Sequence, residues 1–125
     1  MVGVGTFNYP MEIAARPEGP FVRLEPLVDT GALYSWIPAS VLQNVGLSPS
    51  DRGKFRLANG TIIERDLCEA VVRIDGRARH TIVVFGDEGT DALLGAYTME
   101  GFGVMPDPVE KRLVPVTTLP LLNAR

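Results

Sequence analysis

One short segment of this sequence combines residues that are suited to acid–base chemistry. Residues 27–32 read Leu-Val-Asp-Thr-Gly-Ala, so two apolar residues precede Asp29, Thr30 and Gly31. This pattern places a carboxylate where an apolar strand ends. Thr30 brings a hydroxyl that can both donate and accept a hydrogen bond, and Gly31 lets a second backbone approach closely because it has no side chain. The segment therefore has the parts of a site built around a carboxylate.

The same residue types are also common in ordinary turns. An Asp-Thr-Gly sequence would occur by chance in roughly one chain in fifty of this length, on average composition. The segment alone therefore does not decide between a strand followed by a turn and a chemical site.

The elements that would position Asp29 are short strands. Thirteen glycines and ten prolines divide the chain, and β-branched residues alternate with polar ones between these breaks, which is the period of strands. Strands are predicted over residues 21–28, 54–57, 61–65, 70–74, 80–85, 91–94 and 112–116. Short helices are predicted over 40–45 and 97–102. We predict an all-β fold with one or two short helices, and a single domain over residues 1–125.

Two turns are predicted with particular residues. Asn59 and Gly60 tolerate a positive φ and lie between two β-rich runs, which is a strong hairpin signal. Asp75 and Gly76 mark a second hairpin between residues 70–74 and 80–85.

Composition excludes several classes of function. The net charge of −3 and the scattered Lys and Arg residues argue against a nucleic-acid partner. One cysteine, Cys68, and one histidine, His80, leave no disulfide within the chain and favour neither a metal site nor a cofactor. No apolar run reaches the ~18 residues of a membrane helix, and residues 1–15 do not resemble a signal peptide. We therefore expect a cytoplasmic protein with no membrane partner.

Three segments in register resemble the retroviral-like, single-domain aspartic proteases, and most of all their small bacterial and archaeal members. The resemblance covers residues 21–116. Its segments are the active-site tetrad Asp29, Thr30, Gly31 and Ala32, the flap residues Ala58, Asn59, Gly60 and Thr61, and a second signature in which Leu93 and Leu94 precede Gly95. The resemblance implies a retropepsin-like closed β-barrel lobe that is completed as a homodimer.

The mechanism that this resemblance implies needs two carboxylates that share one proton, and the chain has a single Asp-Thr-Gly. A two-fold axis would bring Asp29 of one copy against Asp29 of another. One carboxylate would activate a water molecule and the protonated partner would polarise the scissile carbonyl. Thr30 would lock the pair across the axis, and the carbonyl of Gly31 would bind the main chain of an extended peptide.

The sequence departs from the viral pattern at several places. Viral enzymes often pair an acid after the tetrad with an arginine after the second glycine, and Leu33 and Ala96 stand at these positions. Tyr34 and Trp36 add bulk near the site, and we expect Trp36 to fill the core. Apolar candidates for lining the cleft are Ile62, Val83 and Leu93. Viral dimers interleave their terminal strands, and the candidates here are Met11–Ala14 and Leu113–Val116.

Three functions remain open from the sequence. The first is a homodimeric aspartic endopeptidase that cleaves extended peptides. The second is a non-catalytic, dimeric peptide-binding module with the same fold, which the loss of the ion pair at Leu33 and Ala96 motivates. The third is an unrelated β-barrel in which Asp29 lies on an isolated turn far from Gly95.

Overall fold

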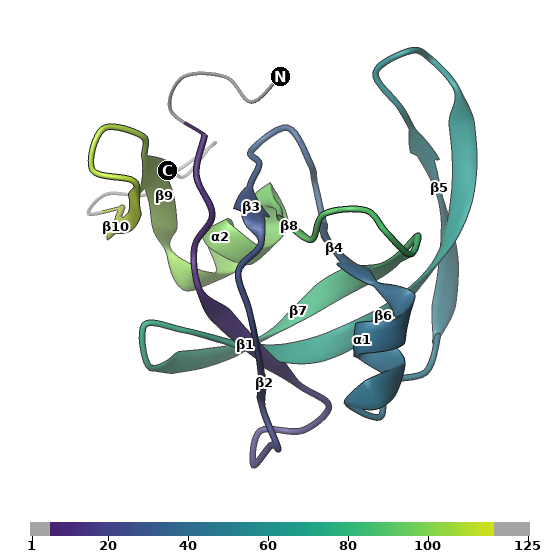
Figure 1. Ribbon diagram of the computed structural model, residues 1–125, viewed down its shortest axis with the longest axis horizontal. Helices are drawn as coiled ribbons and strands as arrows, with labels where there is room; N and C mark the ends of the chain where they lie inside the picture. Colours follow the sequence, from purple (N-terminus) through teal and green to yellow (C-terminus); the bar gives the residue numbers. More distant parts are fainter. Residues whose placement is uncertain (1–5, 117–125) are drawn as a thin grey trace, which may run out of the picture.

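The computed structural model describes residues 6–116, which form one curled sheet, a small hairpin and two short helices (Figure 1). The strands are β1 (Met11–Ala14), β2 (Val22–Leu24), β3 (Leu27–Val28), β4 (Ser35–Pro38), β5 (Asp51–Arg56), β6 (Ile62–Ile74), β7 (Arg77–Gly86), β8 (Leu93–Leu94), β9 (Val104–Asp107) and β10 (Arg112–Pro115). The helices are α1 (Ala39–Asn44) and α2 (Ala96–Phe102).

The main sheet has the strand order β2-β1-β6-β7-β4-β8-β3, and β5 pairs with β6 beside this path. The pairs β4–β7 and β3–β8 are parallel, and the other strand pairs of this sheet are antiparallel. The chain just before β1 also runs along β3, where Asn8 forms a bridge with Leu27. This bridge brings the two ends of the sheet toward each other, so the sheet curls around a core as a half-barrel.

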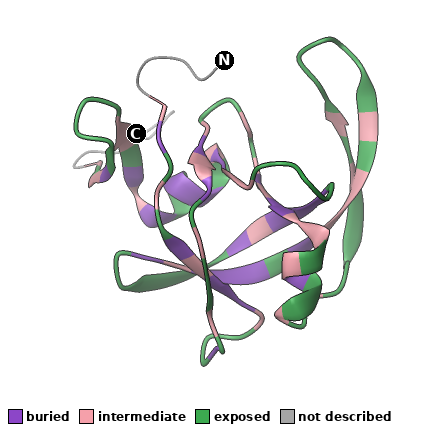
Figure 2. Cartoon of the chain, in the orientation of Figure 1, coloured by how far each residue is buried: buried purple, intermediate pink, exposed green. Residues whose placement is uncertain are grey.

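The long strand β6 holds the sheet and the β5–β6 hairpin together. One end of β6 pairs with β1, the other end pairs with β5, and β7 lies along residues 67–74. Figure 2 shows buried residues concentrated where β1, β6 and β7 cross, whereas the hairpin that β5 forms with β6 is mostly exposed. The core therefore lies under one half of β6, and the other half projects into solvent.

The core is formed by aliphatic side chains from the inner face of the sheet and by the two helices. Ile13, Ile37 and Val72 are fully buried on three different strands. Leu42 of α1 and Met99 of α2 close the core from the helices. Among residues 6–116, no helix is long and apolar enough to cross a bilayer.

The structure confirms the predicted strand-rich fold and both predicted hairpin turns. Residues 57–61 connect β5 to β6, and Asp75 and Gly76 connect β6 to β7, with positive φ at Gly60, Asp75 and Gly76. The single strand predicted over residues 21–28 is divided into β2 and β3, because Glu25 and Pro26 interrupt it. The sequence analysis missed β4 and β9.

Two positional predictions were wrong. Trp36 does not belong to the core: it is half-buried, whereas its neighbours Ser35 and Ile37 are fully buried on the other face of β4. The strand Met11–Ala14 has no free edge for a strand of another chain, because β2 occupies one of its edges and β6 the other.

The thiol of Cys68 gives a test of this core. Burial raises the pKa of Cys68 from an ordinary value of 9.0 to about 11. The folded state therefore holds the proton more tightly than the unfolded state does. The contribution to stability is fully present below the ordinary value and is lost as pH rises toward about 11.

We predict that the Cys68 thiol does not react with a disulfide reagent at neutral pH until the chain unfolds. The free energy of unfolding, measured with urea, should fall across the alkaline range. A Cys68→Ala variant should lack this component of the pH dependence. Rapid labelling of the folded protein at neutral pH would contradict the buried position of Cys68.

Candidate active site

Asp29 lies at the end of β3 and is fixed there through its backbone. Its N–H donates to the carbonyl of Leu94 at 3.0 Å, which continues the parallel pairing of β3 with β8. The preceding N–H of Leu27 donates to the carbonyl of Ala92 at 2.8 Å. The two segments predicted from the sequence, more than sixty residues apart, are therefore in direct backbone contact.

The carboxylate of Asp29 is oriented by the turn that follows it. The N–H of Gly31 donates to Asp29 Oδ1 at 2.9 Å, and the N–H of Ala32 donates to the Asp29 carbonyl at 3.2 Å. A side chain added to Gly31 would lie 3.1 Å from the same Oδ1. The turn thus holds one carboxylate oxygen, and Asp29 stays partly exposed to solvent.

Gly95 lies against the same turn at a distance that no side chain would allow. A Cβ atom at position 95 would stand 2.5 Å from the carbonyl oxygen of Tyr34 and 2.9 Å from that of Ala32. Directly after Gly95, the first two residues of α2 donate to this turn: Ala96 to Ala32 and Tyr97 to Leu33, each at 2.8 Å. The end of β8 and the start of α2 therefore lock the residues that follow Asp29.

A buried hydroxyl network supports this contact from below. The hydroxyl of Ser35 accepts from the N–H of Gly95 at 3.0 Å and contacts the Thr98 hydroxyl at 2.8 Å. Thr98 in turn contacts the hydroxyl of Thr81 at 2.9 Å, and all three side chains are buried. Their hydrogen bonds offset the cost of burying polar groups. The sequence analysis missed all three, because nothing in the sequence indicates that these residues meet.

A hollow of ≈ 300 Å³ opens beside the carboxylate. Thr30 lines it with an exposed hydroxyl that has no hydrogen-bond partner among residues 6–116. Asp29 is the one acidic residue in the lining that the structure describes. The remaining lining residues come from the start of the described chain, from β3 and from the β9–β10 hairpin: Thr6, Phe7, Val28, Pro106 and Pro108. We call this space the Asp29 hollow.

The predicted flap residues form the tip of the β5–β6 hairpin. The N–H of Gly60 donates to the Leu57 carbonyl at 2.9 Å, and Asn59 Oδ1 accepts from the N–H of Thr61 at 2.9 Å. The tip, which includes Ala58, is exposed and stands out from the body in Figure 1. No hydrogen bond within the described chain joins these residues to the turn at Asp29.

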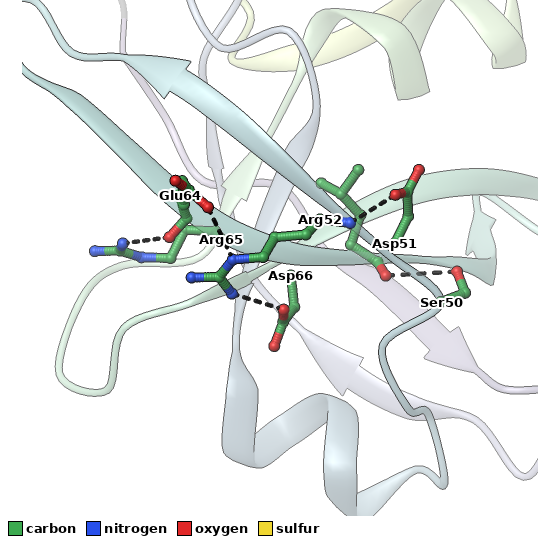
Figure 3. A network of polar contacts seen from close by, with 7 residues as sticks. Ser50, Asp51, Arg52, Glu64, Arg65 and Asp66 are labelled. Carbon is green, nitrogen blue, oxygen red and sulfur yellow. Dashed lines mark hydrogen bonds and ion pairs between the residues drawn. The ribbon is translucent and has the colours of Figure 1, made fainter.

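The base of this hairpin is braced by charged side chains (Figure 3). On its outer face, Arg52 contacts Asp66 at 2.9 Å and Glu64 at 3.2 Å. From its inner face, Arg65 reaches Asp87 at the end of β7, at 2.8 Å. Such exposed pairs contribute little stability each, but together they hold the two arms of the hairpin and one loop of the body in a fixed relation.

The three apolar residues predicted to line a cleft lie in different places. Leu93 is half-buried on the same face of the sheet as Asp29, because it pairs directly with Leu27. Ile62 is 55% exposed near the hairpin tip. Val83 is fully buried in the core, so its assignment to a cleft was wrong.

The comparisons agree with this geometry. A family model described as aspartyl protease matches residues 15–98, which include both Asp29 and Gly95. The chain belongs to this aspartyl protease family. Because Asp29 contacts Leu94 through the backbone, the alternative of an isolated turn on an unrelated barrel is excluded. No curated protein matches the sequence closely enough to count as a relative.

Solved structures show the same retropepsin-like fold at low sequence identity. The retroviral protease-like domain of Ddi1 from Leishmania major has a TM-score of 0.59 and 18% identity, covering 98% of this chain and 100% of that domain. A retropepsin-like aspartic protease from Rickettsia conorii has a TM-score of 0.53 and 21% identity, covering 86% and 91%. The simian foamy virus protease has a TM-score of 0.55 and 17% identity, covering 74% and 91%.

Metal ligands do not gather at the site. Within residues 6–116, no three His, Cys, Asp or Glu side chains lie together as they would around a metal ion. The polar side chains in the described lining of the Asp29 hollow are the carboxylate of Asp29 and the hydroxyls of Thr6 and Thr30.

The close contact at Gly95 predicts a strong effect of a single methyl group. Gly95→Ala should destabilise the fold by about 3 kcal/mol, the upper end of the usual cost of overpacking, because backbone atoms cannot give way as a flexible side chain can. Gly101→Ala is the matched control: it lies in α2 with no atom within 4 Å of the added Cβ, and it should be neutral or slightly stabilising. Urea unfolding of both variants measures the difference. Equal stability of the two variants would contradict the described contact.

Proposed function

We propose that this protein is a homodimeric aspartic endopeptidase in which the Asp29 carboxylates of two copies activate one water molecule between them. The observation that carries the proposal is a carboxylate fixed by the backbone of Leu94 and by the N–H of Gly31, which opens into a hollow with no second acid in its described lining. One carboxylate cannot act as both base and acid on the same water and carbonyl. A second copy supplies the missing group.

The chemistry of the pair follows from two carboxylates in close proximity. Two like charges so close do not both ionise, so the pair holds one proton. The ionised carboxylate takes a proton from water as the water attacks the peptide carbonyl, and the protonated one donates a hydrogen bond to the developing oxyanion. Proton transfer to the leaving nitrogen completes the cleavage. The exposed hydroxyl of Thr30 is available to contact the partner copy across the axis.

An apolar surface beside the Asp29 hollow is suited to the dimer contact. Val109 of the β9–β10 turn is 84% exposed. Pro106 and Pro108 of the same hairpin line the hollow itself. A two-fold axis next to Asp29 brings this surface against its own copy and removes it from water.

The β5–β6 hairpin is proposed as the flap. Its braced base and exposed tip suit a segment that closes over an extended peptide and reopens for release. The substrate class is a peptide in extended form, whose backbone pairs with the hairpin on one side and with the floor near Asp29 on the other.

Asp29→Asn provides the main test. The variant should retain the fold and lose at least ~10³-fold in kcat/KM, because neither copy can then supply an ionised base. Cleavage of a peptide library, read by mass spectrometry, measures the loss. Asp91→Asn is the matched control, since Asp91 is an exposed acid in the turn before β8 and should leave cleavage unchanged.

Cleavage assays of the parent and of Asp29→Asn also decide between an aspartic endopeptidase and a non-catalytic peptide-binding module. Undiminished cleavage by Asp29→Asn would show that the activity does not depend on this carboxylate. A parent protein that binds extended peptides but cleaves none would support the peptide-binding module, whereas binding of a transition-state mimic such as pepstatin would count against that module. This second candidate is favoured by Leu33, which is 61% exposed: Leu33 and Ala96 are uncharged and cannot form the ion pair that viral enzymes often have at these positions.

The pH dependence gives a further prediction. Because the pair must hold one proton, kcat/KM should follow a bell-shaped profile, with an optimum that we expect at mildly acidic pH by analogy with the family. Circular dichroism at each pH separates loss of activity from unfolding. Activity that rises steadily into the alkaline range would contradict a carboxylate pair.

A further inference from the structure

The face of the sheet that carries Asp29 extends across three strands. Side chains alternate along a strand, so Leu27 and Asp29 point away from the buried side chain of Val28. Leu27 pairs with Leu93 of β8, and Leu93 pairs with Trp36 of β4. Trp36 therefore lies on the same face of the sheet as Asp29, which we call the floor. It is two strand spacings from Leu27, and Asp29 is two residues further along β3, so Trp36 and Asp29 are roughly 12 Å apart.

Phe55 of β5 reaches this floor from the arm of the hairpin. Its half-buried side chain lies between the exposed side chains of Lys54 and Arg56. The ring centroid of Phe55 lies 5.0 Å from that of Trp36 with planes at 66°, and 6.4 Å from that of Tyr34 with planes at 82°. These are the edge-to-face arrangements that aromatic rings prefer. Phe55 thus closes the space between the hairpin arm and the floor at this position.

The position of the Phe55 ring is fixed by its neighbours. A Cβ atom added to Gly53 would lie 3.2 Å from Phe55 Cζ, so the ring occupies space that is open because residue 53 has no side chain. On the floor, Tyr34 contacts Tyr97 of α2 with centroids 5.5 Å apart. A row of aromatic rings therefore connects the hairpin to the helix that follows the second signature.

We propose that Phe55 determines specificity, by limiting the size of the substrate side chain that fits at the outer end of the cleft. This inference rests on the proposed function. An extended peptide advances about 3.4 Å per residue, so a wall roughly 12 Å from Asp29 meets a residue three or four positions from the cleaved bond. In a symmetric dimer each copy contributes one Phe55, so the restriction applies on both sides of that bond.

The test is a comparison of cleavage-site preferences in a peptide library for the parent, Phe55→Ala and Phe55→Leu. Removing the ring should raise the relative kcat/KM for Trp, Tyr or Phe over Ala by at least about tenfold at one position on each side of the cleaved bond. Phe55→Leu should give a smaller shift at the same positions. Phe21→Ala is the control, because Phe21 packs on Arg73 next to β2 and should leave the preferences unchanged.

Several results would overturn the inference. Unchanged preferences in active Phe55 variants would show that the ring does not limit the substrate. Equal relaxation at all positions, or loss of cleavage in both Phe55 variants with the fold intact, would assign the ring to hairpin closure instead. If Phe55→Ala does not fold, Phe55→Leu decides the matter. A parent with no Asp29-dependent cleavage would overturn the proposed function, and this inference with it.

Discussion

The backbone contact at Gly95 is the constraint on which the rest of the site depends. Because residue 95 has no side chain, the carbonyl oxygens of Tyr34 and Ala32 approach to distances that a Cβ would forbid. That approach lets Asp29 donate to Leu94 and lets the first residues of α2 donate to the turn after Asp29. The carboxylate is held by main-chain atoms, which are already ordered before any substrate arrives.

The site is rigid on one side and open on the other. On one side, β8, α2 and the buried hydroxyls of Ser35 and Thr98 hold the backbone around Asp29 in place. On the other side, the Asp29 hollow is lined by Thr30 and by prolines of the β9–β10 hairpin. The β5–β6 hairpin also has a fixed part and an exposed part: ion pairs hold its base, and its tip is exposed to solvent. A fixed acid and an apolar surface beside it suit the proposed site, in which two identical chains would each supply one carboxylate.

The sequence predicted the parts of this arrangement that depend on local chemistry. The Asp-Thr-Gly turn, the apolar pair before Gly95 and the Asn59–Gly60 hairpin follow from residue types and are confirmed as structural elements. Their catalytic and flap roles stay predictions. Trp36 was predicted in the core and Val83 in the cleft, and both predictions were wrong. Alternation along a strand shows that the strand has two faces, but it does not show which face packs against the core. The prediction that β1 could pair with another chain failed because β2 and β6 already occupy both of its edges. Which strands are neighbours depends on contacts between distant parts of the chain, and the residues of β1 do not reveal them.

Mixing of subunits tests the central claim most directly. Parent protein and inactive Asp29→Asn protein would be refolded together at a fixed parent concentration, with increasing amounts of the variant. If each site needs one carboxylate from each copy, activity per parent chain should fall to about half in an equal mixture and to about a tenth at a ninefold excess of variant, as random pairing into two-fold dimers requires. Activity per parent chain that stays constant across the whole series would show that one copy is sufficient, and would contradict the shared site.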